Sequence, residues 1–374
     1  MAGLYLHIPF CKQACTYCDF HFSTSLKHKE DLLNALLIEI EQRKNQLSAE
    51  ITTIYFGGGT PSLLSINDFL LINETIQKNY KLTEDIEFTV ECNPDDLTQN
   101  KLKELKQVGV NRLSIGTQSF FDEDLQFFNR AHNSKQAQES ILMSQDLGFE
   151  NITIDLIYNT PTLTLKKWEE NLKKIEELKI PHLSAYALTV EPNTVLHHQV
   201  KTNQTIIPTD EEAIEQFKML IDKTKQFGLT QYEVSNFGKE GFYSQHNSNY
   251  WKGEEYLGFG PSAHSYYTKK RSWNVSNNIK YINAINENRI YSEGEIIDEK
   301  TAYNEYVLTR LRTIWGIETD FISNNFSENI QRHFNSELAQ YLKTSYLQID
   351  NNKVTLTQEG IFIADKIASD LFIV

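Results

Sequence analysis

The stretch Cys11-Lys12-Gln13-Ala14-Cys15-Thr16-Tyr17-Cys18 places three cysteines within one short segment near the start of the chain. Three thiolates on a short loop can hold three irons of a [4Fe–4S] cube, and the fourth iron then stays open to a small molecule. The segment therefore predicts an iron–sulfur cluster bound by Cys11, Cys15 and Cys18.

Zinc is the alternative metal that the same loop could bind. A structural zinc site needs four ligands, usually in two separated pairs, and the chain has no second cysteine pair. His7 or His21 could complete a Cys3His set, so the count of ligands alone leaves zinc open. With four cysteines in 374 residues, a disulfide framework is not expected. The remaining cysteine, Cys92, is interpreted as a small buried apolar residue.

The composition fits one large domain followed by a smaller one. A formal net charge of −14 argues against a general nucleic-acid binder, because phosphate contacts need clustered Lys and Arg. No stretch approaches the roughly 20 apolar residues of a membrane span, so we expect no integral membrane segment. The N-terminus opens into a strand-like run without a basic leader, which predicts a cytoplasmic protein.

Apolar β-rich runs alternate with helical patterns along the first two thirds of the chain. The expected strands cover residues 4–8, 52–56, 86–90, 112–115, 152–157 and 183–188. Apolar residues recur at helical spacing between them, most clearly in the long amphipathic segment 211–227. Repeated strand–helix units imply parallel strands with right-handed crossovers. The sequence therefore predicts an α/β fold, an incomplete (β/α)6 barrel.

Polar residues fall at or just past the ends of three of these strands. Glu91, Gln118 and Asp155 occupy such positions. Because the carboxyl ends of parallel strands meet at one mouth of a barrel, we expect these side chains to face a common site.

The rest of the chain divides into two further regions. Residues 229–297 carry weaker periodicity and many aromatics, and residues 298–374 combine helical segments with a hairpin pattern around Asp350–Asn352. The predicted domains are thus 1–228 for the barrel, 229–297 for a connecting region and 298–374 for a winged-helix-like α+β domain. Because the tail has no basic recognition face, we interpret it as a packing or partner module. The segment 358–371 is expected to close the chain as a helix.

Gly3-Leu4-Tyr5-Leu6-His7-Ile8-Pro9-Phe10, leading into the three cysteines, Asp19 and Phe20, resembles the start of radical S-adenosylmethionine (SAM) proteins. Within that superfamily the chain is similar, over nearly its whole length, to oxygen-independent coproporphyrinogen oxidases and their relatives, the HemW heme chaperones. The resemblance implies a [4Fe–4S] cluster and SAM as cofactors and an external electron donor for the cluster. It leaves open whether SAM is cleaved in turnover or only bound.

Several motif positions match SAM-contacting residues of the family. Gly57-Gly58-Gly59-Thr60-Pro61 alone would predict a turn, but after the cysteine loop it resembles the segment that holds the methionine part of SAM. Tyr5 could equally belong to the core. By resemblance, the SAM-binding set is Tyr5, Tyr17, Gly58, Gly59, Thr60, Glu91, Gln118, Arg130 and Asp155.

Two features separate the two branches of the family. The coproporphyrinogen oxidases carry a fourth cysteine two residues after the third, where this chain has Phe20, and they carry an N-terminal extension that this chain lacks. His246-Asn247-Ser248-Asn249-Tyr250-Trp251 resembles the H-N-x-x-Y-W motif of the heme chaperones. An imidazole suits heme iron and aromatic rings suit a porphyrin face, so we expect heme contacts from His246, Tyr250 and Trp251.

The sequence thus favours a radical SAM protein of the HemW type that binds heme and transfers it to heme-accepting proteins. By resemblance, the acceptors are respiratory hemoproteins at the membrane, and a homodimer is left open. The alternative is an enzyme, an oxygen-independent coproporphyrinogen III dehydrogenase that decarboxylates propionate side chains to give protoporphyrinogen IX. A zinc-stabilised binding module without radical chemistry is a third reading.

Overall fold

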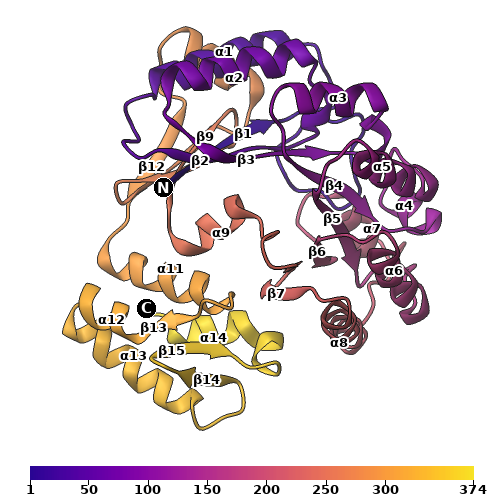
Figure 1. Ribbon diagram of the computed structural model, residues 1–374. Helices are drawn as coiled ribbons and strands as arrows, with labels where there is room; N and C mark the ends of the chain where they lie inside the picture. Colours follow the sequence, from indigo (N-terminus) through magenta and orange to yellow (C-terminus); the bar gives the residue numbers. More distant parts are fainter.

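The computed structural model describes residues 1–374 as an open barrel with a smaller C-terminal domain below its opening (Figure 1). Six parallel strands lie side by side in chain order, which confirms the predicted (β/α)6 arrangement. They are β1 (Ala2–Ile8), β2 (Ile51–Gly58), β3 (Leu82–Cys92), β4 (Arg112–Gln118), β5 (Asn151–Tyr158) and β6 (His182–Ala187).

Helices cover the convex face of this sheet, and their apolar sides form the main core with the strands (Figure 1). They are α1 (Lys29–Gln42), α2 (Ile66–Asn79), α3 (Gln99–Gln107), α5 (Ser134–Asp146), α6 (Leu165–Glu177) and α8 (Asp210–Gln226). The short helix α4 (Asp122–Phe127) follows β4, and α7 (Val195–Lys201) packs in a separate small apolar cluster. Hydrogen bonds to N-cap side chains define the first residue of several of these helices. Thr209 accepts a hydrogen bond from the backbone N–H of Glu212, whose carboxylate accepts from the backbone N–H of Thr209. Short 3-10 turns, η1 (Pro61–Leu63) and η2 (Pro94–Asp96), follow β2 and β3.

The predicted connecting region, residues 229–297, supplies strands to both edges of the same sheet. β9 (Glu255–Phe259) runs parallel to β1, and β10 (His264–Tyr267), β11 (Lys270–Asn274) and β12 (Ser292–Ile296) extend that edge as antiparallel strands. β8 (Asn236–Gly238) and β7 (Thr230–Glu233) add to β6. The result is one sheet of 12 strands.

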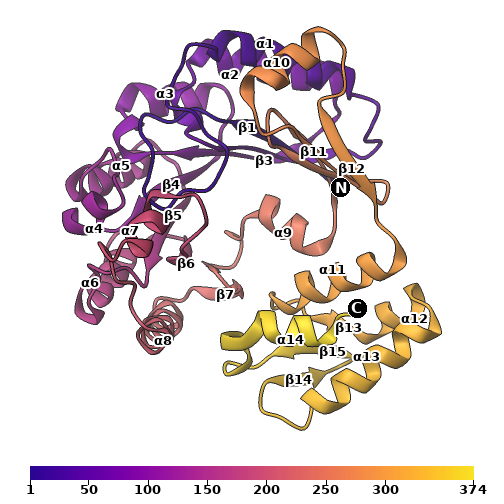
Figure 2. The same cartoon turned by 180° about the vertical axis from the view of Figure 1, so that it is seen from behind.

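Two helices of this region take different places. α10 (Asn278–Asn286) packs beside α1 on the outside, as Figure 2 shows from behind. α9 (Gln245–Lys252) lies on the concave side of the sheet, between the barrel and the C-terminal domain (Figures 1 and 2). The structure thereby places the His246 segment inside the barrel.

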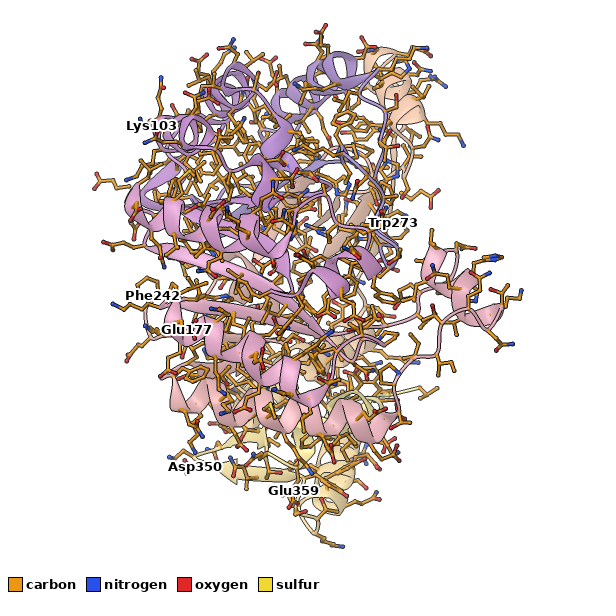
Figure 3. All side chains as sticks on the ribbon, turned by 90° about the vertical axis from the view of Figure 1, so that its right-hand side faces the viewer. Lys103, Glu177, Phe242, Trp273, Asp350 and Glu359 are labelled. Atoms are coloured by element: carbon orange, nitrogen blue, oxygen red, sulfur yellow. The ribbon has the colours of Figure 1, made fainter.

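Residues 298–374 form a compact unit with its own cluster of 13 buried apolar residues. Its elements are α11 (Glu299–Leu311), β13 (Ile317–Glu318), α12 (Thr319–Asn325), α13 (Glu328–Tyr341), β14 (Leu347–Asp350), β15 (Lys353–Leu356), η3 (Gly360–Ile363) and α14 (Ala364–Leu371). Helices packed on a three-stranded sheet agree with the expected winged-helix-like shape. In Figure 3 the labelled Asp350 and Glu359 mark this unit, well below Trp273 of β11. None of the chain's helices combines the length and the apolar character that a bilayer span requires.

Some element boundaries differ from those predicted. β2 continues through Gly57 and Gly58, because both backbones pair with β1 even though glycine lacks a side chain to favour a strand. The segment 358–371 is not one helix. It begins as the 3-10 turn η3, where Thr357 caps the backbone N–H of Gly360 and the carbonyl of Tyr346 lies too close to Gly360 for a side chain.

Asp155 does not lie at a strand end as expected. β5 runs three residues further, to Tyr158, because its residues from Thr153 to Tyr158 pair with β6. Asp155 therefore projects from the middle of the strand. Its carboxyl group lines a small polar cavity in the barrel together with Glu91.

Candidate functional site

The three cysteines lie in the loop that follows β1, and their thiols are free and partly exposed. The loop is fastened to its surroundings by backbone hydrogen bonds, from the N–H of Cys11 to the carbonyl of Ser23 at 3.0 Å and from Thr16 to Phe128 at 3.1 Å. Gln13 adds a side-chain bond to the carbonyl of Asn129. A tethered loop with three accessible thiols fits a cluster in which each thiolate holds a separate iron.

Arg130 joins this loop to the mouth of the barrel. Its guanidinium donates to the Sγ of Cys15 at 3.3 Å, to the Oδ1 of Asn93 at 2.6 Å and to the carbonyl of Gly116 at 3.0 Å. The planar fork of arginine suits such simultaneous contacts. Arg130 therefore lies between the cysteine loop and β4, and its contact with SAM stays a prediction.

Two buried polar atoms at this position have no partner within the protein. They are the Nε of Arg130 and the Oε1 of Gln118. Gln118 ends β4 with φ at +57°, an unusual value for a residue other than glycine, and its amide group lies over Gly116 beside Arg130. Because buried polar groups are nearly always hydrogen-bonded, an unpaired donor and an unpaired acceptor here fit a polar ligand such as SAM.

The glycine segment holds the backbone close to the cysteine loop. Gly59 donates its N–H to the carbonyl of Ile8 at 2.9 Å, and Thr60 donates to the carbonyl of Phe10 at 2.6 Å. The hydroxyl of Thr60 lies against the Sγ of Cys11 and accepts from Asn93. Gly58 has φ at +102°, and a Cβ there would lie 2.5 Å from the His7 ring. The segment therefore needs glycine both for its conformation and for space.

Glu91 is the carboxylate nearest this backbone. It accepts hydrogen bonds from the N–H of Gly58 at 3.1 Å and from the hydroxyl of Tyr55 at 2.8 Å. Tyr5 stacks on Tyr55 with ring centroids 6.0 Å apart. Burial raises the pKa of Glu91, and the two hydrogen bonds act in the opposite direction. A carboxylate at this position is suited to a cationic group of a ligand.

Tyr17 lies in the cysteine loop, where its phenol is close enough to Arg130 and Asp155 for their charges to act on it. Its ring packs edge-on against Phe128 at 5.2 Å, in a small apolar cluster with α7. Burial raises the pKa of Tyr17, so its phenol stays protonated. Tyr17 thus packs on Phe128 with its phenol near Arg130, and its contact with SAM stays a prediction.

Asp155 lines a small polar cavity of about 70 Å³ in the barrel interior, together with Glu91, Arg112 and His182. Burial, reinforced by the charge of Glu91, raises the pKa of Asp155 to about 7. The carboxyl group is therefore close to half-protonated at neutral pH.

The raised pKa of Asp155 predicts a pH-dependent stability. Between the unfolded pKa of about 4 and the folded value, the folded state holds more protons, so its stability falls as pH rises through that window. The substitution Asp155→Asn removes the ionisable group and therefore this decrease in stability. Relative to the wild type, the variant should gain roughly 2–4 kcal/mol of unfolding free energy from about pH 4 to about pH 8. Urea unfolding at several pH values measures it, with the exposed Asp350→Asn as control. A difference that does not change with pH would contradict the assignment.

His246, predicted to contact heme, is buried on α9 with 2% of its surface exposed. Its Nδ1 is within 2.8 Å of the Thr53 hydroxyl and its Nε2 within 2.7 Å of the Tyr250 hydroxyl. Its ring stacks on Tyr55 at 4.9 Å. Burial lowers the pKa of His246 to about 3, so the imidazole is neutral. In this arrangement both ring nitrogens are occupied.

A large cleft opens between the cysteine loop, α9, the β10–β11 hairpin and the C-terminal domain. Its volume is about 1470 Å³. Of the predicted SAM residues it is lined by Tyr5, Gly58 and Glu91, and of the predicted heme residues by Tyr250 and Trp251. Part of each predicted set therefore borders one space. Binding sites for small molecules of drug size are usually about 300–1,000 Å³, so the cleft has room for a large cofactor.

The zinc alternative does not agree with the geometry. No three His, Cys, Asp or Glu side chains converge on one ion position. His7, four residues before Cys11, has its Nε2 on the carbonyl of His21 at 2.9 Å and its Nδ1 near the Tyr5 hydroxyl at 3.2 Å. His21 has its Nε2 on Asn278. The loop therefore lacks a fourth ligand in position.

Three residues of the site were missed by sequence reasoning. Tyr55 links Glu91 to His246, Asn93 links Arg130 to Thr60, and Thr53 holds His246. Two of them could have been inferred from the sequence. Thr53 and Tyr55 alternate with Gly57 along β2, so their side chains point to the same face of the sheet as Gly57. His197 and His198 lie on α7, where Thr194 caps the helix.

Comparisons with known proteins agree with this geometry. A family model described as the radical SAM superfamily matches residues 5–175, and one for the HemN C-terminal domain matches residues 297–363. Among solved structures, the radical SAM enzyme coproporphyrinogen III oxidase (HemN) from Escherichia coli superimposes with a TM-score of 0.86 over 99% of this chain and 90% of that chain. At 21% identity, that similarity concerns the fold.

Curated relatives are closer in sequence. "Heme chaperone HemW" of Bacillus subtilis (strain 168) is 34% identical over 371 residues, which cover 98% of each chain. The protein of that name from Lactococcus lactis subsp. lactis (strain IL1403) is 32% identical over 363 residues, 97% of this chain and 95% of its own. With such identity over its whole length, and with the cysteine loop and cleft described above, the chain belongs to the HemW family of the radical SAM superfamily.

Proposed function

We propose that this protein binds heme in the large cleft and transfers it to heme-accepting proteins, with a [4Fe–4S] cluster on Cys11, Cys15 and Cys18 and with SAM beside it. The single observation that carries the proposal is the cleft itself, about 1470 Å³ in volume and bordered by the cysteine loop and by Tyr250 and Trp251. The names of the relatives support the heme part, and superfamily membership supports the cluster and SAM.

The protein's own residues have separable roles in this proposal. Arg130 holds Cys15 against the barrel mouth, and together with Gln118 it offers unpaired polar atoms to SAM. Glu91 presents a carboxylate to the cationic part of SAM. Gly58, Gly59 and Thr60 keep the backbone within reach of the bound SAM. A reduced cluster, when bound, supplies the electron that can cleave SAM.

Phe20 bears on the choice between a chaperone and an enzyme. It stands where the enzyme branch has a fourth cysteine, and 69% of its surface is exposed at the cleft. An exposed aromatic ring beside a cleft suits contact with an apolar ligand or a partner protein. We propose respiratory hemoproteins at the membrane as acceptors, with the protein itself in the cytoplasm.

Anaerobic heme titration followed by transfer tests the proposal. The wild type should bind heme with saturable stoichiometry and should pass it faster to membranes that carry heme-depleted respiratory cytochromes than to apomyoglobin. Incubation with coproporphyrinogen III, SAM and a reductant should leave that substrate unchanged. Conversion to protoporphyrinogen IX without heme binding would replace the chaperone proposal by the dehydrogenase.

A further inference from the structure

The histidine of the H-N-x-x-Y-W segment is poorly placed to reach heme iron. An axial ligand needs a ring nitrogen with a free lone pair that faces the porphyrin. His246 is held on both nitrogens, by Thr53 and by Tyr250, and is shielded by stacked tyrosines. Gly3 on β1 leaves the space that this ring fills, since a Cβ there would lie 3.3 Å from it. His246 thus supports the wall of the cleft from behind.

Three other imidazoles border the cleft, those of His7, His21 and His264. His7 is buried with both nitrogens engaged, and His21 is bound through Nε2 to Asn278. His264, on β10, is exposed, and its ring lies near only one other aromatic ring, that of Trp273, at 6.2 Å (Trp273 is labelled in Figure 3). His264 is therefore the imidazole with both nitrogens available to a ligand in the cleft.

The β10–β11 hairpin presents two further groups to the same cleft. Tyr266 is two residues from His264, on the same face of β10, and Lys269 stands in the turn that follows. Arg271, the next cation, is already paired with Glu305 and Glu295. An imidazole, an aromatic ring and an unpaired ammonium on one hairpin match the iron, the plane and the propionates of a heme.

We propose that His264 supplies the axial imidazole to the iron of a heme seated in this cleft, with Tyr266 against the porphyrin and Lys269 near a propionate. The inference rests on the proposed heme binding and names the ligand within it. In this arrangement His264 lies near His7, and both line the cleft together with Tyr5 and Glu91. The heme iron then sits next to the predicted SAM position.

The protonation state of His264 agrees with this role. Partial burial and, to a smaller extent, the charge of Arg271 lower the pKa of its imidazole, so the ring is neutral at physiological pH. A neutral imidazole is the form that coordinates iron.

The experiment compares heme with metal-free protoporphyrin IX, by anaerobic titration of the full-length protein. His264→Ala should weaken heme binding at least tenfold and shift the Soret band, and it should leave protoporphyrin IX binding within about twofold of the wild type. Added imidazole should restore the wild-type spectrum. His198→Ala, an exposed histidine on α7 outside the cleft, is the matched control and should bind both porphyrins normally.

The outcomes separate this inference from the proposed function. If the wild type binds no heme, the proposed function fails and the ligand assignment fails with it. If the wild type binds heme and His264→Ala keeps its affinity and spectrum, only the ligand assignment is overturned. His246→Ala, checked by circular dichroism for folding, is the competing variant. If it loses heme selectively over protoporphyrin IX while His264→Ala does not, the iron ligand is His246.

Discussion

Cys15→Ser is expected to abolish cluster binding, so that anaerobically reconstituted protein contains almost no iron or sulfide. A hydroxyl is a poor substitute for a thiolate on iron, and Cys15 is the thiol that Arg130 holds at 3.3 Å. The loop itself is fastened by backbone bonds at Cys11 and Thr16, which the substitution leaves in place. Iron and sulfide analysis with absorbance measures the loss, and far-ultraviolet circular dichroism should match the wild type.

The fourth cysteine provides a matched control. Cys92 ends β3 with 4% of its surface exposed, and its thiol contacts only the carbonyl of Val90, at 3.5 Å. Cys92→Ala should therefore keep the full iron and sulfide content. Retention of iron by Cys15→Ser, or loss of iron from Cys92→Ala, would overturn the assignment of the cluster to the loop after β1.

Gly58→Ala is expected to destabilise the fold by about 3 kcal/mol. Strain at a positive φ costs about 1–3 kcal/mol, and overpacking adds about 1–3 kcal/mol. Both apply at Gly58, where φ is +102° and a Cβ would lie 2.5 Å from the His7 ring. The His7 ring cannot yield freely, because the His21 carbonyl and the Tyr5 hydroxyl hold it. Urea unfolding of the cluster-free proteins measures the difference.

Gly109 separates the two contributions. It follows the C-cap residue of α3 with φ at +93°, close to the value at Gly58, but a Cβ there would meet nothing within 4 Å. Gly109→Ala should therefore cost only the strain, about 1–2 kcal/mol. Equal losses for the two variants would mean that the contact with His7 adds nothing and that backbone conformation alone requires glycine at position 58.

The local pattern of the sequence predicted the barrel well, because each strand and helix carries its own periodicity. The strands from Leu4 to Leu188 came within a few residues of their observed bounds, and the long helix at 211–227 within one residue. The predicted strand bounds were wrong where hydrogen bonding to a neighbouring strand outweighed the local preference of the residues. Gly57 and Gly58 remain in β2, and β5 extends to Tyr158, because neighbouring strands offered hydrogen bonds that composition does not encode.

The cysteine spacing, the glycine segment and Glu91 could be recognised from the chain, because each is a local motif with a direct chemical meaning. Tertiary structure decided which of them meet. It brought the Arg130 guanidinium to the Sγ of Cys15, although the two residues are 115 positions apart in the sequence, and it stacked Tyr55 on His246. It also turned His246 inward and left His264 open to the cleft. Hydrogen bonding and burial depend on what the fold brings alongside a side chain, and one-dimensional spacing does not contain that information.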